Sequence, residues 1–326
     1  MFKRIIGATL VAAPLFMWQP AALAQAPWPN KPVRVVVAGA PGSGTDIVAR
    51  AFTDSLAKAF GQPFVVDNKA GANGLIGTDA VAKSAGDGYH LLFTYAAAHV
   101  VNPVLMDKLP YDVHKDFAAV AQIGAGGNFL VVPASLPVKD LKEFVAYVKA
   151  KPADELSYGS WGNGSGGHLS MEALKQQTGL KMKHIPYKST AAANTDLVAG
   201  HIQVAFSATA SSLPLIKAGK LKAIAISGTY RSKQMPEIAT MTEQGVKFDV
   251  NAWYAVFAPA GTPPAIVNAL NKEIMRQIAA PEMAERWNSL GFSEMPINTP
   301  EQFSDQVKRD LRDWGAIVKA GNIKVE

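Results

Sequence analysis

The chain has 326 residues and no cysteine. Without cysteine there is no disulfide, no thiolate metal ligand and no attachment point for a lipid anchor. Secreted proteins commonly rely on disulfides, so an exported protein of this size has to be stabilised by its hydrophobic core instead.

The chain also has only a small excess of positive over negative charge. The chain has 32 Lys and Arg against 26 Asp and Glu, which gives a formal net charge of +6 without long basic runs. Nucleic-acid-binding domains concentrate Lys and Arg on one face, so this balance argues against nucleic acid as a partner. It is compatible with an anionic small molecule.

Motifs for catalysis and metal binding are missing as well. No Gly-x-Ser-x-Gly segment marks a nucleophile, and the six histidines show neither His-x3-His nor His-Glu-x2-His spacing. Asp46 and His168 are the candidate acid–base residues, and neither has a recognisable orienting partner. We therefore expect no catalytic residue, no metal and no cofactor.

The N-terminus has the pattern of a secretory signal peptide. Lys3 and Arg4 precede an apolar stretch at 5–18, and Ala22-Leu-Ala24 forms a small-x-small cleavage site. The alternative is a membrane anchor, but the stretch is shorter than the ~20 residues that a membrane span needs, and Pro14 interrupts it. We predict cleavage after Ala24 and a soluble periplasmic protein that is not a lipoprotein.

The rest of the chain alternates apolar strands with amphipathic helices. Strands are expected at 33–37, 64–66, 91–93, 129–132, 157–158, 183–185, 202–206, 222–226 and 248–258. Helices are expected at 45–60, 74–85, 138–150, 168–177, 191–198, 264–279, 281–290 and 300–320. Such alternation predicts parallel sheets covered by helices on both faces. Because about 300 residues exceed one typical core, we predict two domains, one of residues 25–126 with 228–326 and one of residues 127–227.

A glycine-rich loop at 39–46, Gly-Ala-Pro-Gly-Ser-Gly-Thr-Asp, lies between the first strand and the first helix. The free N–H groups and partial positive charge of a helix start make an anion site. Thr45 stands where a Walker A loop needs lysine, and Ile47 where a dinucleotide fingerprint needs its third glycine. A carboxylate or small oxyanion, bound by backbone amides and the Ser43 and Thr45 hydroxyls, fits better. The alternative is a tight turn with Thr45 or Asp46 as helix cap.

A second glycine-rich loop at 159–167 precedes another helix and carries Ser160, Asn163 and Ser165. The two α/β units are not a sequence repeat, but two helix starts aimed at one cleft would hold an anion from both sides. The alternative is a flexible surface loop. Trp161 either fills the floor of the cleft or forms a flat wall for a ligand, and His168 either caps the helix, contacts ligand or is solvated.

An ordered set of segments makes the chain resemble a known family over nearly the whole mature length. The segments are 28–34, 41–50, 61–68, 87–89, 109–112, 156–160, 162–165, 184–188, 216–221 and 258–263. They resemble the substrate-binding proteins of tripartite tricarboxylate transporters, also called Bug proteins.

The resemblance implies a two-lobed α/β periplasmic binding protein, type II-like, with a ligand cleft between two doubly wound domains. It implies a monomer that closes on a small carboxylate and delivers it to membrane transporter subunits. Two alternatives are a ligand-presenting component of a sensory system and a periplasmic enzyme on the same scaffold. The residues implied or inferred to bind ligand are Gly42, Ser43, Gly44, Thr45, Asp46, Tyr95, Ser160, Trp161, Asn163, Gly164, Ser165, His168 and Ser207.

The chain departs from the family pattern at three positions. Ser207 stands where an acidic residue often occurs, and Gln203 where aspartate is common, which weakens the case for an amino-acid ligand. Trp161 replaces a usually small residue. With Tyr95 nearby, it suggests a planar or aromatic carboxylate, because aromatic rings offer large apolar contact; alternatively, Trp161 only shrinks the cleft.

Overall fold

The computed structural model describes residues 28–320 except 107, 249 and 291, so the predicted signal peptide lies outside the described residues. The strands are β1 (Val33–Val37), β2 (Phe64–Asn68), β3 (His90–Tyr95), β4 (Phe117–Gly126), β5 (Asn128–Pro133), β6 (Ser157–Ser160), β7 (Lys183–Pro186), β8 (Val204–Ala208), β9 (Leu221–Ile226) and β10 (Ala252–Pro259). The helices are α1 (Gly44–Phe60), α2 (Leu75–Ala82), α3 (Asn102–Leu105), α4 (Leu141–Lys149), α5 (Gly166–Thr178), α6 (Thr190–Val198), α7 (Thr209–Lys217), α8 (Pro264–Ala279), α9 (Ala284–Ser289) and α10 (Pro300–Ala320).

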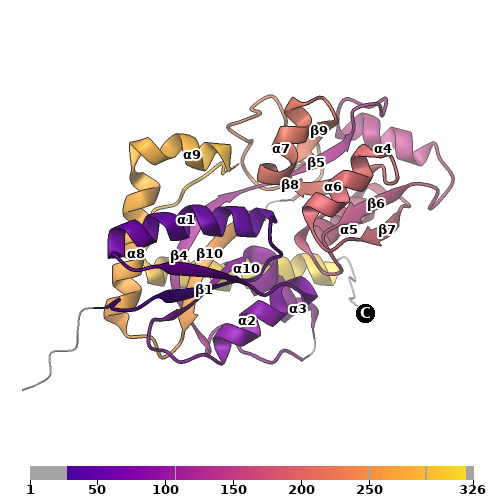
Figure 1. Ribbon diagram of the computed structural model, residues 1–326. Helices are drawn as coiled ribbons and strands as arrows, with labels where there is room; N and C mark the ends of the chain where they lie inside the picture. The colour runs from indigo at the N-terminus through magenta and orange to yellow at the C-terminus, as the bar shows by residue number, and fades with distance from the viewer. Residues whose placement is uncertain (1–27, 107, 249, 291, 321–326) are drawn as a thin grey trace, which may run out of the picture.

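These elements form two lobes, each built around a five-stranded sheet flanked by helices (Figure 1). Lobe 1 has the strand order β2-β1-β3-β10-β4, and lobe 2 has the order β7-β6-β8-β5-β9. The predicted two-domain α/β architecture is therefore confirmed. The prediction of purely parallel sheets is wrong, because β10 runs antiparallel to β3 and β4, and β5 runs antiparallel to β8 and β9. β5 and β10 each follow a segment that crosses between the lobes. A parallel neighbour would instead need a crossover connection, usually a helix, that returns the chain to the same end of the sheet.

Several boundaries differ from the sequence-based expectation. The expected strand 248–258 begins only at Ala252, and Phe248 is buried in the core instead. The expected helix 281–290 is split into a 3₁₀ turn, Pro281–Met283, and α9. Strand β4 and helices α3 and α7 were not expected. The helices at 264–279 and 300–320 were predicted with the observed bounds.

The periodicity of the sequence places the core as expected. Along β1, Val33, Val35 and Val37 join the apolar cluster on one face of the sheet, whereas Val36 joins the cluster on the other. This alternation covers both faces of the strand with apolar side chains. On α1 the predicted face is buried at its centre, but Ile47 is 39% exposed because it lies at the edge of the helix's apolar stripe.

The chain crosses between the lobes at two adjacent points. Gly127 links β4 to β5, and residues 227–251 link β9 to β10. The two crossings are hydrogen-bonded: Asn128 N–H donates to Ser227 Oγ (2.9 Å), and Ser227 N–H donates to the Asn128 carbonyl (3.0 Å). A Cβ at Gly127 would lie 1.8 Å from the Ser227 carbonyl oxygen, so only glycine allows this approach. The crossings are therefore a closely packed candidate hinge.

The second crossing contains a segment that packs on lobe 2. Met241 N–H donates to the Ile226 carbonyl, and Gln177 and Lys247 exchange two hydrogen bonds. These contacts attach the segment to lobe 2, although the predicted boundary at 227/228 assigns it to lobe 1. The boundaries 126/127 and 227/228 stay a prediction.

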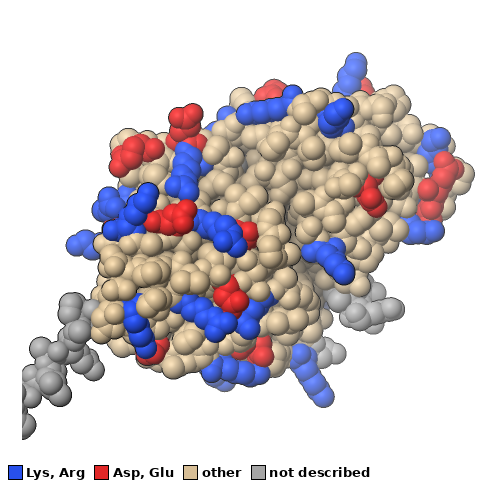
Figure 2. All heavy atoms as spheres, viewed as in Figure 1, with Lys and Arg blue, Asp and Glu red and all other residues tan. Residues whose placement is uncertain are grey.

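The surface agrees with the mild charge balance. On the face shown in Figure 2, basic and acidic side chains are interspersed rather than gathered in a single basic patch. Within the described part of the chain, the helices are all too short or too polar to span a membrane.

Candidate functional site

A cavity of about 730 Å³ lies between the lobes. The starts of four helices contribute to its wall: Ser43, Gly44 and Thr45 of α1, Gly74 before α2, Gly164 and Gly166 of α5, and Ser189 and Thr190 of α6. The first N–H groups of a helix have no acceptor within the helix, and the aligned peptide dipoles place partial positive charge there. The wall is therefore suited to an anion.

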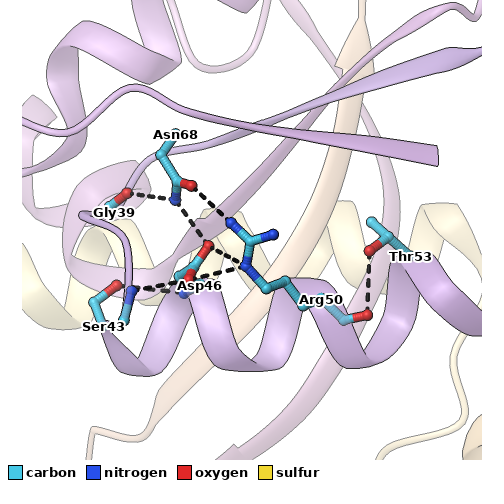
Figure 3. A network of polar contacts seen from close by, with 7 residues as sticks. Gly39, Ser43, Asp46, Arg50, Thr53 and Asn68 are labelled. Carbon is cyan, nitrogen blue, oxygen red and sulfur yellow. Dashed lines mark hydrogen bonds and ion pairs between the residues drawn. The ribbon is translucent and has the colours of Figure 1, made fainter.

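The start of α1 is held by a reciprocal pair of hydrogen bonds. Ser43 Oγ accepts from Asp46 N–H (3.3 Å), and Asp46 Oδ2 accepts from Gly42 N–H (2.9 Å). Figure 3 shows Arg50 and Asn68 converging on the same carboxylate, with Arg50 Nε 3.0 Å from Asp46 Oδ1. Burial opposes ionisation of Asp46, but these hydrogen bonds outweigh it and lower its pKa. Asp46 thus fixes the loop. Gly44 and Thr45, the first two helical positions, line the cavity, and their N–H groups have no acceptor within the helix.

The start of α5 repeats this arrangement with other side chains. Ser165 Oγ accepts from His168 N–H (3.3 Å), and His168 Nδ1 accepts from Gly164 N–H (3.1 Å). In both loops a glycine with positive φ precedes the capping serine, 75° at Gly42 and 70° at Gly164. Left-handed backbone at this point favours glycine. The two loops therefore share a Gly-Ser-Gly helix start, a local likeness that the sequence comparison of the two units missed.

A stack of rings supports the second loop from behind. The rings of His168 and His184 are parallel, with centroids 4.1 Å apart, and Tyr158 stacks on His184 at 4.8 Å. Ser160 Oγ lies 2.7 Å from His184 Nε2 and donates to the Gly162 carbonyl. Burial lowers the pKa of His168 and brings that of His184 to about 4. Both imidazoles are therefore neutral at pH 7, and only a neutral His168 can accept from Gly164.

Trp161 lies between the second loop and the core. A Cβ at Gly167 would come within 2.5 Å of the Trp161 ring, and one at Gly166 within 3.4 Å, so the ring rests on the first turn of α5. The same ring lines the cavity and packs against the core. Trp161 therefore forms part of the cavity wall.

Asn73 connects the two lobes across the cavity. Its Nδ2 donates to the Gly164 carbonyl of the second loop (3.1 Å) and to Asn102 Oδ1 (2.9 Å), while its Oδ1 accepts from the Tyr95 hydroxyl (3.0 Å). The backbone of Asn73 is left-handed, with φ 50° and ψ 42°. Asparagine is among the few residues other than glycine that adopt this conformation readily. The side chain thereby links lobe 1 to the loop before α5 of lobe 2.

Comparison with known proteins agrees with this geometry. Residues 48–323 match the family model described as "Tripartite tricarboxylate transporter family receptor". The chain belongs to this family. It is similar to Protein BugT of Bordetella pertussis, with 35% identity over 92% of each chain.

Solved structures of relatives have the same fold. An R. palustris protein determined with adipate has a TM-score of 0.87 and 30% identity, and the match covers 91% of this chain and 99% of that one. The periplasmic binding protein BugD has a TM-score of 0.85 and 32% identity, with 92% and 100% covered. The family is one of solute-binding proteins, and a periplasmic location is consistent with it.

All predicted ligand residues of this family member except Ser207 fall into two groups. The cavity is lined by Ser43, Gly44, Thr45, Tyr95, Trp161, Asn163 and Gly164. The residues that shape the loops without lining the cavity are Gly42, Asp46, Ser160, Ser165 and His168. Ser207 is fully buried on β8, and its hydroxyl has no hydrogen-bond partner within the described residues. Gln203 accepts from Ser157 N–H and donates to the Gly200 carbonyl, so it joins strand ends outside the cavity wall.

Sequence reasoning missed other residues that line the cavity. Asn73, Tyr187, Lys188, Ser189, Ser227 and Tyr254 are among them. A signal was present for some: Asn73 lies in a third glycine-rich loop, Gly71-Ala-Asn-Gly74, directly after β2. Lys188 belongs to a segment already quoted for the family resemblance. Across the described residues, no cluster of three or more His, Asp and Glu side chains is placed to bind a metal ion.

Proposed function

We propose that this protein is a monomeric periplasmic solute-binding protein that captures a small organic carboxylate between its lobes. It then delivers the ligand to a tripartite tricarboxylate-type membrane transporter. The observation that carries the proposal is the pair of Gly-Ser-Gly helix starts, which reach one cavity from opposite lobes. The adipate held by a relative is a ligand of this chemical class.

Carboxylate binding follows from the free backbone donors. Gly44 and Thr45 on lobe 1, and Gly166 and Gly167 on lobe 2, occupy the first two positions of their helices. Hydrogen bonds between a backbone N–H and a carboxylate are charge-assisted and stronger than neutral ones. Because the donors come from both lobes, a bound carboxylate favours the closed arrangement over the open one.

The proposal does not include catalysis. Asp46 is ion-paired to Arg50, and His168 Nδ1 accepts a backbone hydrogen bond. Both candidate acid–base groups are therefore engaged in holding the loops, and neither lines the cavity.

The first test identifies the ligand. Native mass spectrometry of the protein purified without added acid should show a small bound acid, and calorimetry should then show micromolar or tighter binding. Absence of binding across aliphatic and aromatic mono- and dicarboxylates would refute the proposed function. Deletion of the gene should abolish uptake of the bound acid; unchanged uptake would refute delivery and favour ligand presentation to a sensor.

A second test removes one donor of the first loop through Gly44→Pro. Proline is tolerated at the first helical position, and Ser43 has the extended backbone (φ −71°, ψ 163°) that suits a residue before proline. A Cβ at Gly44 would lie 2.8 Å from the Tyr254 hydroxyl, so the substitution is made in Tyr254→Phe, with Tyr254→Phe alone as control. Loss of a hydrogen bond to a charged group costs about 1.5–3 kcal/mol, which corresponds to about 10- to 150-fold weaker binding. Equal affinity of the folded double variant and its control would exclude this amide from the site.

A further inference from the structure

The cavity wall combines two kinds of surface. The helix starts supply backbone amides and hydroxyls, whereas Leu105, Met106, Phe248, Val250 and Trp314 supply apolar side chains. Trp161 contacts both kinds of surface, because it rests on the start of α5 and packs against the core cluster that also contacts Leu105 and Val250. A ligand that fills the cavity therefore needs an anionic end and an apolar body.

Besides its helix starts, the wall carries a single cationic side chain. Lys188 is the one lining residue with a charged side chain in the described part of the chain, and it lies beside Ser189 at the start of α6. The apolar side chains themselves offer neither a cation nor a helix start to a carboxylate. Burying an unpaired carboxylate there is strongly unfavourable.

The size of the cavity admits a ring-bearing acid. At about 730 Å³ it falls in the range of about 300–1,000 Å³ typical of pockets for drug-sized ligands. A ring can lie against the face of Trp161, a contact that an open-chain diacid such as adipate cannot make. Aromatic rings gain additional energy by stacking on or packing edge-on against another aromatic ring.

We propose that the ligand is a monocarboxylate with a ring-sized aromatic body. Its carboxylate lies at the starts of α1 and α5, and its ring packs against Trp161. This inference rests on the proposed function and names the substrate class of the same site. It distinguishes this chain from the adipate-bound relative, whose ligand carries two carboxylates.

Calorimetry with five acids tests the inference: benzoate, 3-phenylpropanoate, cyclohexanecarboxylate, malate and adipate. We expect at least one of the two aromatic acids to bind tenfold or more tightly than malate and adipate. Tighter binding of either diacid would overturn the inference and leave the proposed function intact. Tightest binding of cyclohexanecarboxylate would overturn the aromatic part of the inference, whereas no binding of any carboxylate would refute the proposed function itself.

Variants at Trp161 locate the ring. An aromatic pair contributes about 0.5–1.5 kcal/mol beyond area burial, so Trp161→Ala should weaken the preferred aromatic acid about 2- to 12-fold. Trp161→Phe, which keeps an aromatic face, should restore most of the loss. Gly167→Ala, whose Cβ would lie 2.5 Å from the Trp161 ring, should weaken the same ligand by displacing the ring. Unchanged affinity of Trp161→Ala, with a melting temperature close to that of the parent, would contradict the assignment.

Discussion

The hydrogen bond from Asn73 to Gly164 joins lobe 1 to the ligand loop of lobe 2, so removing it should weaken ligand binding. Asn73→Gly removes the side chain and leaves a residue that adopts the observed φ of 50° without strain. The substitution therefore removes the interlobe contact and keeps the backbone conformation. We expect the variant to fold and to bind ligand more weakly.

The expected loss of affinity depends on how many hydrogen bonds of the Asn73 side chain join the two lobes. Of the three hydrogen bonds made by the Asn73 side chain, only the one to the Gly164 carbonyl spans the lobes; those to Asn102 and Tyr95 stay within lobe 1. A neutral hydrogen bond contributes about 0.5–1.5 kcal/mol net. If this energy is lost only from the closed state, affinity falls about 2- to 12-fold.

The assay is calorimetry with the carboxylate that binds most tightly in the five-acid panel. Ala72→Gly is the matched control, because Ala72 also has positive φ (46°) and lines the cavity, but its methyl side chain cannot form a hydrogen bond to lobe 2. The control should bind as the parent does. If Asn73→Gly and Ala72→Gly bound equally well, the interlobe hydrogen bond would make no contribution to closure, and the reasoning would be refuted.

Two further predictions concern stability. Gly127→Ala should lower the free energy of unfolding by about 1–3 kcal/mol in urea titrations, because its Cβ would lie 1.8 Å from the Ser227 carbonyl oxygen; Gly315→Ala, whose Cβ would meet Val104 at an ordinary 3.5 Å, should be neutral or stabilising. Equal free energies of unfolding for Gly127→Ala and Gly315→Ala would show that the two crossings can move apart at Gly127 and Ser227 without loss of stability. Burial lowers the pKa of His184 in the folded protein from 6.5 to about 4. As the pH falls, the unfolded chain therefore binds a proton at this residue before the folded protein does. The free energy of unfolding should be highest above pH 6.5 and should decrease as the pH drops toward 4. His184→Gln should reduce this pH dependence, and an unchanged slope would exclude His184 as its source.

Much of the site was predictable because helix starts are encoded locally. Gly-Ser-Gly followed by an amphipathic run predicts both the cap and the free amides, and α1 and α5 begin within two residues of the predicted positions. The same local periodicity placed α8 and α10. Such patterns depend on neighbours in sequence, which is why a single chain reveals them.

Contacts between distant residues were not predictable in the same way. Asn73 and Gly164 are 91 positions apart, and the packing of lobe 1 against lobe 2 brings them within hydrogen-bond distance. The antiparallel strands β5 and β10 read like any other buried apolar run, since strand direction depends on where the chain crosses between lobes. Sequence likewise grouped Asp46 and His168 with ligand residues, although the structure uses both to hold loop backbone.

The two loops reach the same geometry with side chains of different charge, and this has a functional consequence. Asp46 is ionised and paired with Arg50, and its pKa is lowered, so the first loop keeps its shape well into the acid range. The second loop needs a neutral His168, in a cluster that also contains Tyr158, Glu172, Lys175 and His184. Protonation of Nδ1 would replace the acceptor for Gly164 N–H with a second donor. We therefore expect acid to weaken the proposed carboxylate site through the loop of lobe 2, while the loop of lobe 1 keeps its shape.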